Sequence, residues 1–224
     1  KNLNSLSWEI LLVKILWSIC DRLSSVRIPF FYILTHTYIH IYITGVRLGA
    51  GGSGVVHKAT LSGMPVVVKS LISHMMAEEI DEFLREAAML AKLRHPNVCV
   101  FYGIGVKSDT MYLVQEYCDG GSLRDFRKFS GYDHRKHTAK FMEQLFKTLH
   151  YLHSRAIPVI HRDIKPDNLL IHGGCILKIG DLGTSREQGT TEEEQMMTQN
   201  ATGTVHYMPP EALRHVYRDK RNTV

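Results

Sequence analysis

A glycine-rich stretch flanked by strand-like sequence constrains the fold of this chain most strongly. Residues 49–56 read GAGGSGVV, between the strand-like runs VRLGA at 46–50 and VVHKATL at 55–61. The same glycine spacing opens a helix in dinucleotide-binding proteins, but no helical pattern follows it here. The pattern therefore predicts an antiparallel hairpin whose glycines leave backbone N–H groups able to face phosphate oxygens. A flexible hairpin turn without a ligand is the alternative at this stage.

The elements that follow predict an α+β fold in two lobes. A third strand-like run lies at 65–71, and two more lie at 98–106 and 111–118. Helices are predicted over 77–93 and 138–154, because apolar residues recur there at helical spacing. Their core-facing residues are Ile80, Phe83, Leu84, Ala87, Leu90 and Ala91 in the first helix and Phe141, Leu145, Leu149 and Leu152 in the second. We expect a small β-rich N-lobe with one helix at 45–117 and an incomplete helical C-lobe at 118–224.

Residues 1–44 differ in character from the rest of the chain. The 19 residues at 28–46 carry no charged side chain, and this length is in principle sufficient to cross a bilayer. Their richness in Tyr, Ile and Thr also suits an ordered extension, while the near-repeat THTYIHIYIT suggests low-complexity sequence that is disordered or non-native. These three interpretations stay open. No secretory signal is predicted, because Lys14 interrupts the apolar run at 10–19 and no small-residue cleavage site follows it.

Charge and cysteine content narrow the class of protein. The 224 residues carry a net charge of +5, and residues 45–224 account for only +3 of it, so no nucleic-acid partner is predicted. The four cysteines form no CxxC pair, and their spacing suits neither a zinc site nor a disulfide framework. They are Cys20, Cys99, Cys118 and Cys175. We expect free thiols in a reducing compartment, and hence a cytoplasmic protein.

Lys69 ends the apolar run VVVK, fifteen residues after Gly54. A lysine at the end of a buried strand needs a partner, because an unpaired buried ammonium group is costly. Glu86 lies seventeen residues further on, in the first predicted helix, and is a plausible partner. Such a pair would hold the ammonium group where it can reach phosphate oxygens. Taken alone, Glu86 is better explained as a surface residue of that helix.

The stretch HRDIKPDNLL at 161–170 brings charged residues together just before a predicted strand. Asp163 and Asn168 stand five residues apart, and Asp181 follows Asp163 by eighteen in KIGDLG. These three could supply one base and two oxygen ligands for Mg²⁺, a hard cation that prefers oxygen. Lys165 could neutralise a phosphoryl group during transfer. A solvated turn is the alternative for this stretch by itself.

Together these motifs resemble the eukaryotic protein kinase domain. The glycine-rich loop, strand lysine, helix glutamate, HRD loop, DLG and MPPE follow one another in the family's order, from about Val46 to Leu213. The resemblance implies ATP and Mg²⁺ as cofactors. In that reading the backbone of Gly49, Gly51 and Gly54 covers the phosphates, and Lys69, held by Glu86, contacts them. Asp163 orients the substrate hydroxyl and accepts its proton, while Asn168 and Asp181 hold Mg²⁺.

The resemblance also implies an adenine site. Gln115 falls at the gatekeeper position, followed by Glu116, Tyr117 and Cys118 in the segment that connects the lobes. Val56, Val67 and Leu170 should enclose the adenine, with Leu48 and Ser122 at the edges of the site. Leu90, Phe101, His161 and Leu182 should form an apolar column that links the lobes of active kinases. For every apolar residue in these sets, ordinary core packing is an equally adequate explanation.

Substrate class and regulation are further expectations from the resemblance. Lys165 and Thr204 are typical of Ser/Thr kinases, and GGSL with GTVHYM is most similar to the tyrosine-kinase-like group, which mainly phosphorylates Ser and Thr. Protein substrates with Ser or Thr are therefore expected. Because Arg162 precedes Asp163, we expect activation by loop phosphorylation, through an upstream kinase or autophosphorylation. The candidate positions are Thr190, Thr191, Thr198 and Thr202; an unmodified loop residue is the alternative for each.

Some positions depart from the family pattern. Leu182 replaces the usual Phe, Pro209 the usual Ala, and Val67 the usual Ala, which narrows the adenine slot. The chain ends at Val224, thirteen residues after Glu211, whereas the large lobe of a kinase normally continues further. We expect Glu211 to lack its usual arginine partner. Two hypotheses follow: a catalytic Ser/Thr kinase, or a truncated, non-catalytic kinase-like fragment that binds nucleotide or a protein partner.

Overall fold

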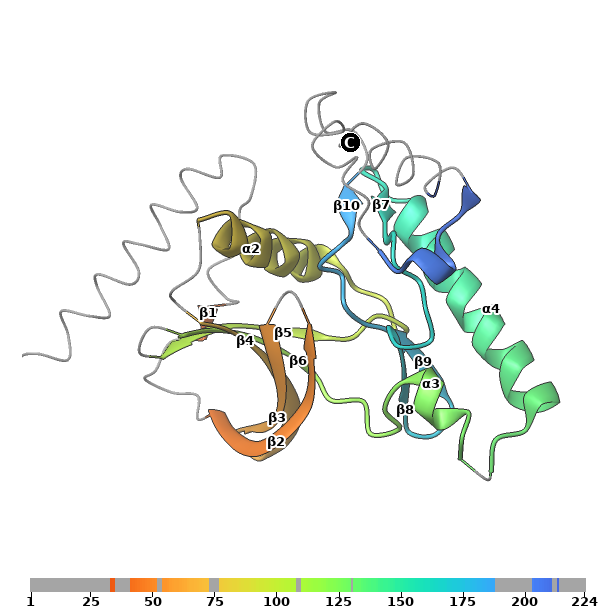
Figure 1. Ribbon diagram of the computed structural model, residues 1–224, viewed down its shortest axis with the longest axis horizontal. Coiled ribbons are helices and arrows are strands. Elements are labelled where there is room, and N and C mark those ends of the chain that lie inside the picture. Colours follow the sequence, from red (N-terminus) through yellow and green to blue (C-terminus); the bar gives the residue numbers. More distant parts are fainter. Residues whose placement is uncertain are drawn as a thin grey trace, which may run out of the picture.

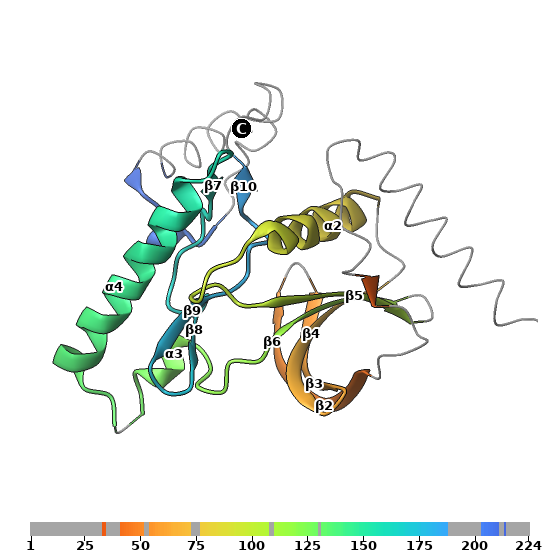
Figure 2. The ribbon, with the colours of Figure 1, turned by 180° about the vertical axis from the view of Figure 1, so that it is seen from behind.

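The computed structural model describes residues 33–34, 41–51, 54–72, 77–107, 110–129, 131–187, 203–210 and 213. These residues form two lobes (Figure 1). The first holds a six-stranded sheet with helix α2 (Ala77–Lys92) beside it, and the second holds helix α4 (His134–His153) with two small two-stranded sheets. The view from behind shows the same separation, with α2 above the sheet and the second lobe to the left (Figure 2). This is the predicted α+β architecture.

The sheet of the first lobe has the strand order β1-β5-β6-β4-β3-β2. Its strands are β1 (Ile33–Leu34), β2 (Ile41–Gly51), β3 (Gly54–Leu61), β4 (Met64–Ile72), β5 (Phe101–Lys107) and β6 (Thr110–Glu116). Neighbours from β2 to β6 pair antiparallel, which confirms the predicted hairpins. The exception is β1, which pairs parallel to β5 at the edge of the sheet and was not predicted as part of it.

Strand β2 crosses the boundary that the sequence placed between residues 44 and 45. It begins at Ile41, and its Ile41 to Ile43 pair with Leu61 to Ala59 of β3. Residues 33–34 and 41–46 therefore lie in the sheet, and the rest of residues 1–40 is outside the described residues, so the three interpretations of residues 1–44 stay predictions. Within the parts of the chain that the structure describes, no helix combines the length and the apolar character needed to span a membrane.

Helix α2 forms where the apolar spacing predicts it. Phe83, Leu84, Ala87, Leu90 and Ala91 are buried on one face, and Ile80 is half-buried. That face packs into a cluster with Leu71 of β4 and Leu113 of β6, so burial of the apolar stripe fixes the helix against the sheet. The helix ends at Lys92. Pro96 follows shortly after, and proline has no backbone N–H with which to continue a helix.

The second lobe is built around α4. The helix begins at His134, four residues before the predicted start, because the Asp133 side chain accepts hydrogen bonds from the backbone N–H groups of Arg135 and Lys136. Phe141, Leu145 and Leu152 are buried on one face. The remaining elements are α3 (Leu123–Phe126), β7 (Val159–Ile160), β8 (Leu169–His172), β9 (Ile176–Ile179), β10 (Arg186–Glu187) and a 3-10 turn at Val205–Tyr207.

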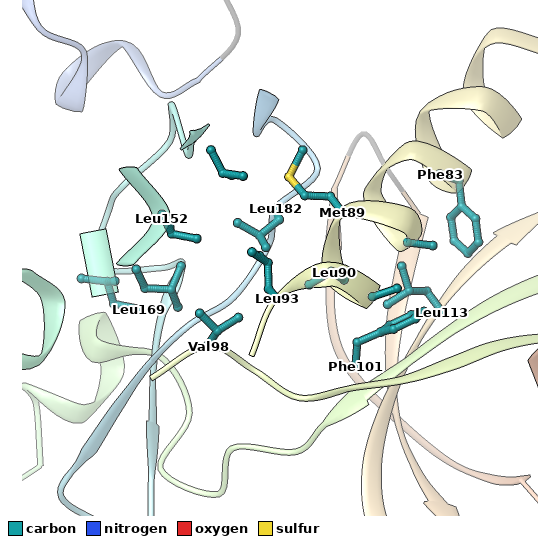
Figure 3. Packing of buried hydrophobic residues seen from close by; sticks show 14 of the residues in the cluster. Phe83, Met89, Leu90, Leu93, Val98, Phe101, Leu113, Leu152, Leu169 and Leu182 are labelled. Carbon is teal, nitrogen blue, oxygen red and sulfur yellow. The ribbon is translucent and has the colours of Figure 1, made fainter. Parts of the chain in front are cut away.

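One apolar cluster joins the two lobes. It includes Leu90 of α2, Phe101 of β5, Leu152 of α4 and Leu182, and Figure 3 shows Leu182 among residues of both lobes. Three members of the predicted column, Leu90, Phe101 and Leu182, thus share one cluster, and His161 is also buried. The opposite face of the sheet has a separate cluster around Val66, Val68 and Val114.

Candidate active site

The glycine-rich stretch forms the tip of the β2–β3 hairpin. Gly51 pairs with Gly54, and Gly49 pairs with Val56 on the returning strand. Gly54 has φ of +119°, and a Cβ added there would lie 2.4 Å from the Ser70 carbonyl oxygen. Only glycine fits this position without a backbone shift, since the left-handed conformation and the close approach both exclude a side chain. The hairpin therefore presents backbone at the edge of the site.

Lys69 lies on β4 and points toward α2. Its Nζ is 2.6 Å from Oε2 of Glu86 and 3.8 Å from Oδ1 of Asp181. The side chains of Lys69 and Glu86 are 10% and 2% exposed, so this is a buried pair, whereas the Asp181 side chain is 47% exposed. The three residues come from β4, α2 and the segment after β9. The predicted Lys69–Glu86 contact is present, and it places the ammonium group beside an accessible carboxylate.

Burial dominates the ionisation of Glu86. Removal from water raises the pKa of this carboxyl, and the attraction of Lys69 opposes the rise without cancelling it. A buried Glu86 carboxylate needs the Lys69 ammonium group as its partner. The Lys69–Glu86 pair therefore depends on the packing of α2 against the sheet.

Asp163 is the centre of a second network. One carboxylate oxygen, Oδ2, accepts from Lys165 Nζ at 2.6 Å and from Asn168 Nδ2 at 2.9 Å. The other, Oδ1, accepts from the backbone N–H of Thr204 at 2.8 Å. Lys165 also donates to Oγ1 of Thr204 at 2.7 Å. Residues 163–168 are thus fixed against residue 204, far away in the sequence, as the predicted site requires.

These contacts favour the ionised form of Asp163. Burial by itself would raise its pKa, but the hydrogen bonds from Lys165 and from Thr204 outweigh it and hold the pKa below the ordinary value. A carboxylate that stays charged can accept a hydrogen bond from a substrate hydroxyl and later its proton.

His161 connects the segment that contains Asp163 to Gly180. The backbone N–H of Asp163 donates to its Nδ1 at 3.3 Å, so Nε2 carries the proton and donates to the Gly180 carbonyl at 3.2 Å. This neutral tautomer agrees with burial, which lowers the pKa of His161. The neighbouring Arg162 has φ of 68° and donates from Nε to the Thr184 carbonyl at 2.7 Å. The segment that carries Asp163 is therefore hydrogen-bonded to residues on both sides of Asp181.

The oxygen atoms of Asn168 and Asp181 suit a divalent cation. Both protons of Asn168 Nδ2 are directed at Asp163, which leaves the amide oxygen of Asn168 as an acceptor. The backbone N–H of Gly180, next to Asp181, donates to the Asn168 carbonyl at 3.0 Å, so the two ligand candidates lie close together. Asp181 has φ of 47°, an uncommon conformation for a residue with a side chain and one that is often found at functional sites. This donor set fits Mg²⁺.

The predicted adenine residues lie on facing elements. Strand pairing puts Val56 opposite Lys69 and Val67 opposite Gln115, and all but Lys69 are half-buried. Leu170 lies on β8 and is bridged to Ser122, whose hydroxyl caps α3 by accepting from the Asp125 N–H. Leu48 is 46% exposed on β2. That these residues contact a nucleotide stays a prediction.

Two predicted cofactor residues turn their side chains away from the site. The Glu116 carboxylate accepts from Lys178 Nζ at 2.7 Å and from the Val100 N–H at 3.0 Å. The Cys118 thiol faces Cys99, with the two sulfur atoms 3.9 Å apart. Only backbone groups of Glu116 and Cys118 can then serve a nucleotide. Cys99, Cys118 and Cys175 are free thiols, and Cys20 lies outside the described residues.

Sequence reasoning missed Lys178. This lysine lies in the apolar run ILKIG on β9, and its side chain is 9% exposed. The signal that singled out Lys69, a lysine within a buried strand, applies equally to Lys178. Lys178 opens the stretch KIGDLG, in which the resemblance assigns a role to Asp181 but none to the lysine.

Arg162 and Arg186 lie near each other, close to Glu82 and Arg85 of α2. Burial lowers the pKa of both arginines; Arg186 lowers the pKa of Arg162 further, and Arg85 does the same to Arg186. The four candidate threonines at 190, 191, 198 and 202 lie outside the described residues, as does Glu211.

Comparison with known proteins agrees with this geometry. Residues 42–223 match the family model described as protein kinase domain. The chain is 36% identical over 183 residues to serine/threonine-protein kinase CTR1 of Arabidopsis thaliana, covering 80% of this chain and 22% of that protein. It is 33% identical over 186 residues to serine/threonine-protein kinase VIK of the same plant, covering 80% and 42%. The chain thus spans less than half the length of these relatives.

The family match covers most of the chain and includes both lobes, the Lys69–Glu86 pair and the Asp163 network. The chain belongs to the protein kinase domain family.

Proposed function

We propose that this chain transfers the γ-phosphoryl group of ATP to Ser or Thr hydroxyls of protein substrates. The observation that carries the proposal is the Asp163 carboxylate, which Lys165, Asn168 and Thr204 hold in a fixed orientation. Positioning of this kind is the main contribution of a protein to phosphoryl transfer.

Each group then has a defined part in the reaction. Lys69, oriented by Glu86, binds phosphate oxygens of ATP, and the glycine-rich hairpin covers them with backbone N–H groups. Asp163 orients the substrate hydroxyl and accepts its proton, while Lys165 offsets negative charge beside it. Mg²⁺, held by Asn168 and Asp181, would neutralise charge on the phosphates.

The Lys165–Thr204 contact supports Ser/Thr as the acceptor class. Lys165 Nζ bridges the base and the Thr204 hydroxyl, which fills the space beside Asp163 with a compact polar pair. Lysine and threonine at these two positions are typical of Ser/Thr kinases, and the Asp163 side chain that both residues contact is 6% exposed. The relatives CTR1 and VIK are named serine/threonine kinases, which agrees with this assignment.

Loop phosphorylation is the proposed control. Arg162 and Arg186 lie near each other and near α2, and together they offer positive charge that a phosphate on one of the loop threonines could bind. The phosphate would come from an upstream kinase or from autophosphorylation. We place the protein in the cytoplasm because Cys99, Cys118 and Cys175 are free thiols.

A thermal melt with and without Mg²⁺ and ATP, followed by a phosphotransfer assay, tests the proposal. ATP at 100 times its dissociation constant should add about 2.7 kcal/mol to the free energy of unfolding. The shift should disappear in Lys69→Ala. Transfer to a Ser/Thr protein substrate should fall by about 100-fold or more in Asp163→Asn, since the general base is lost.

A melt that shifts without any phosphotransfer would support the other hypothesis, a non-catalytic nucleotide-binding fragment. Equal phosphotransfer by Asp163→Asn and the unaltered chain would contradict the proposed role of Asp163.

A further inference from the structure

An ion pair behind the adenine segment has no part in the function described so far. Glu116, at the end of β6, and Lys178, on β9, are joined at 2.7 Å, and their side chains are 13% and 9% exposed. The pair connects two stretches that are 62 residues apart in the sequence. Removing both charges from water costs free energy that the attraction within the pair offsets only in part. A buried ion pair is therefore poorly explained by stability alone.

The contacts of Glu116 fix the start of the connecting segment. Its backbone N–H donates to the Val100 carbonyl at 2.9 Å, and its carboxylate accepts from the Val100 N–H at 3.0 Å. Glu116 therefore binds both backbone polar groups of Val100. Its carboxylate also accepts a hydrogen bond from Lys178. The backbone at Glu116, where the segment expected to face adenine begins, cannot rotate without breaking these bonds.

The contacts of Lys178 fix the floor of the same site. Lys178 pairs with Leu170 across β8 and β9, and Leu170 is the residue expected beneath the adenine. The β8–β9 hairpin is also tied to the connecting segment by backbone hydrogen bonds from Gly120 to Ile171 and from Ile171 to Gly121, each 2.8 Å long. Gly120 and Gly121 thus bind the connecting segment to β8, and Lys178 adds an ion pair from β9 to the start of that segment at Glu116.

We propose that Glu116 and Lys178 are a pair of positioning residues that hold the adenine-binding backbone at a fixed height above Leu170. This inference rests on the proposed function, because it assigns the pair to the ATP site. Neither side chain touches the nucleotide. Their removal should weaken adenine binding while leaving the groups that act on the phosphates, Lys69 and Asp163, in place.

The test compares a neutral pair with a matched control. Glu116→Gln with Lys178→Met removes both charges, keeps an acceptor for the Val100 N–H and leaves no buried charge unpaired. The control is Glu143→Gln with Lys147→Met on α4, a pair of similar length, 2.6 Å, whose side chains are more than 60% exposed. Lys178→Arg, which keeps the cation, is the conservative variant.

Adenosine binding to the full 224-residue chain is measured by calorimetry below the melting temperature, together with KM for ATP and kcat. We expect the dissociation constant of adenosine and KM to rise about tenfold in the neutral pair, at the low end of effects seen for residues that orient ligands. The kcat at saturating ATP should change less than about twofold. The control should match the unaltered chain, and Lys178→Arg should retain most of the affinity.

Unchanged adenosine affinity in a folded neutral-pair variant would overturn the inference while leaving the proposed function intact. A neutral pair that loses its cooperative melt, beside a Lys178→Arg variant with full stability and affinity, would also overturn it, because the cation would then serve folding alone. An unaltered chain that binds no adenosine would overturn the proposed function, and the inference with it.

Discussion

At the scale of single residues, the hairpin glycines differ in what they tolerate. A Cβ at Gly54 would lie 2.4 Å from a backbone oxygen, and its φ of +119° is unfavourable for any side chain. We expect Gly54→Ala to distort the hairpin tip, raise KM for ATP and cost about 1–3 kcal/mol of stability. Steady-state kinetics and chemical denaturation measure the two effects.

Gly105→Ala on β5 is the control for Gly54→Ala. A Cβ there would meet its nearest neighbours at 3.6 and 3.9 Å, an ordinary van der Waals contact. Its KM should stay at the value of the unaltered chain. If both variants behaved alike, the close approach at Gly54 would not be what determines ATP binding.

His161 provides a prediction of pH dependence. Burial lowers its pKa below the ordinary 6.5, although the Gly180 carbonyl and the nearby Asp181 and Asp163 oppose the shift. Between the lowered pKa and 6.5 the unfolded chain binds more protons than the folded one, so stability should fall as the pH drops below about 6.5. Denaturation of the unaltered chain and of His161→Phe between pH 5 and 7 should show a flatter dependence in the variant.

His150→Phe on the exposed side of α4 is the matched control for His161→Phe. It gives the effect on stability of exchanging an exposed histidine for phenylalanine, against which the effect of His161→Phe is compared. Identical slopes for His161→Phe and the unaltered chain would mean that His161 does not change its protonation on unfolding.

At the scale of elements, helix α2 determines whether Lys69 has its partner. Phe83 is 3% exposed and belongs to the same apolar cluster as Ile104 and Leu113. Figure 3 shows Phe83 on α2, on the side of Leu113. Phe83→Ala should cost about 3–5 kcal/mol through lost burial and the cavity left behind. Because α2 carries Glu86, the same variant should also weaken ATP binding.

Phe83→Leu, which keeps most of the apolar volume, should show a much smaller loss of stability and near-normal ATP affinity. Urea denaturation and titration with ATP are the measurements. A Phe83→Ala variant that lost stability yet bound ATP normally would show that the position of Glu86 does not depend on this packing.

At the scale of the whole molecule, Leu182 links the lobes. It is 1% exposed, directly follows Asp181, and belongs to the cluster that includes Leu90 and Leu152 (Figure 3). We expect Leu182→Ala to lower stability by about 2–5 kcal/mol and to reduce kcat, because the cavity frees both α2 and the Asp181 backbone. Met142→Ala, at an exposed position of α4, should change neither quantity.

The sequence by itself determined the family of this chain, its candidate site residues and most of its elements. The spacing of Lys69, Asp163, Asn168 and Asp181, and the order of strands and helices, depend on local patterns that periodicity and motifs reveal. Helix α2 was predicted to within one residue, since its apolar stripe is local information. The contact of Lys69 with Glu86 could be expected as well, because a lysine at the end of a buried strand needs a partner and Glu86 lies in the next predicted element.

Only the tertiary structure decided how distant residues meet. The parallel pairing of β1 with β5, the direction of the Glu116 carboxylate and its contact with Lys178 depend on segments far apart in the chain. Local sequence carries no signal for them, because a side chain chooses its partner from whatever the fold brings within about 3 Å. The candidate site residues can therefore be predicted from the sequence. The contacts that position them form only when segments far apart in the chain pack together.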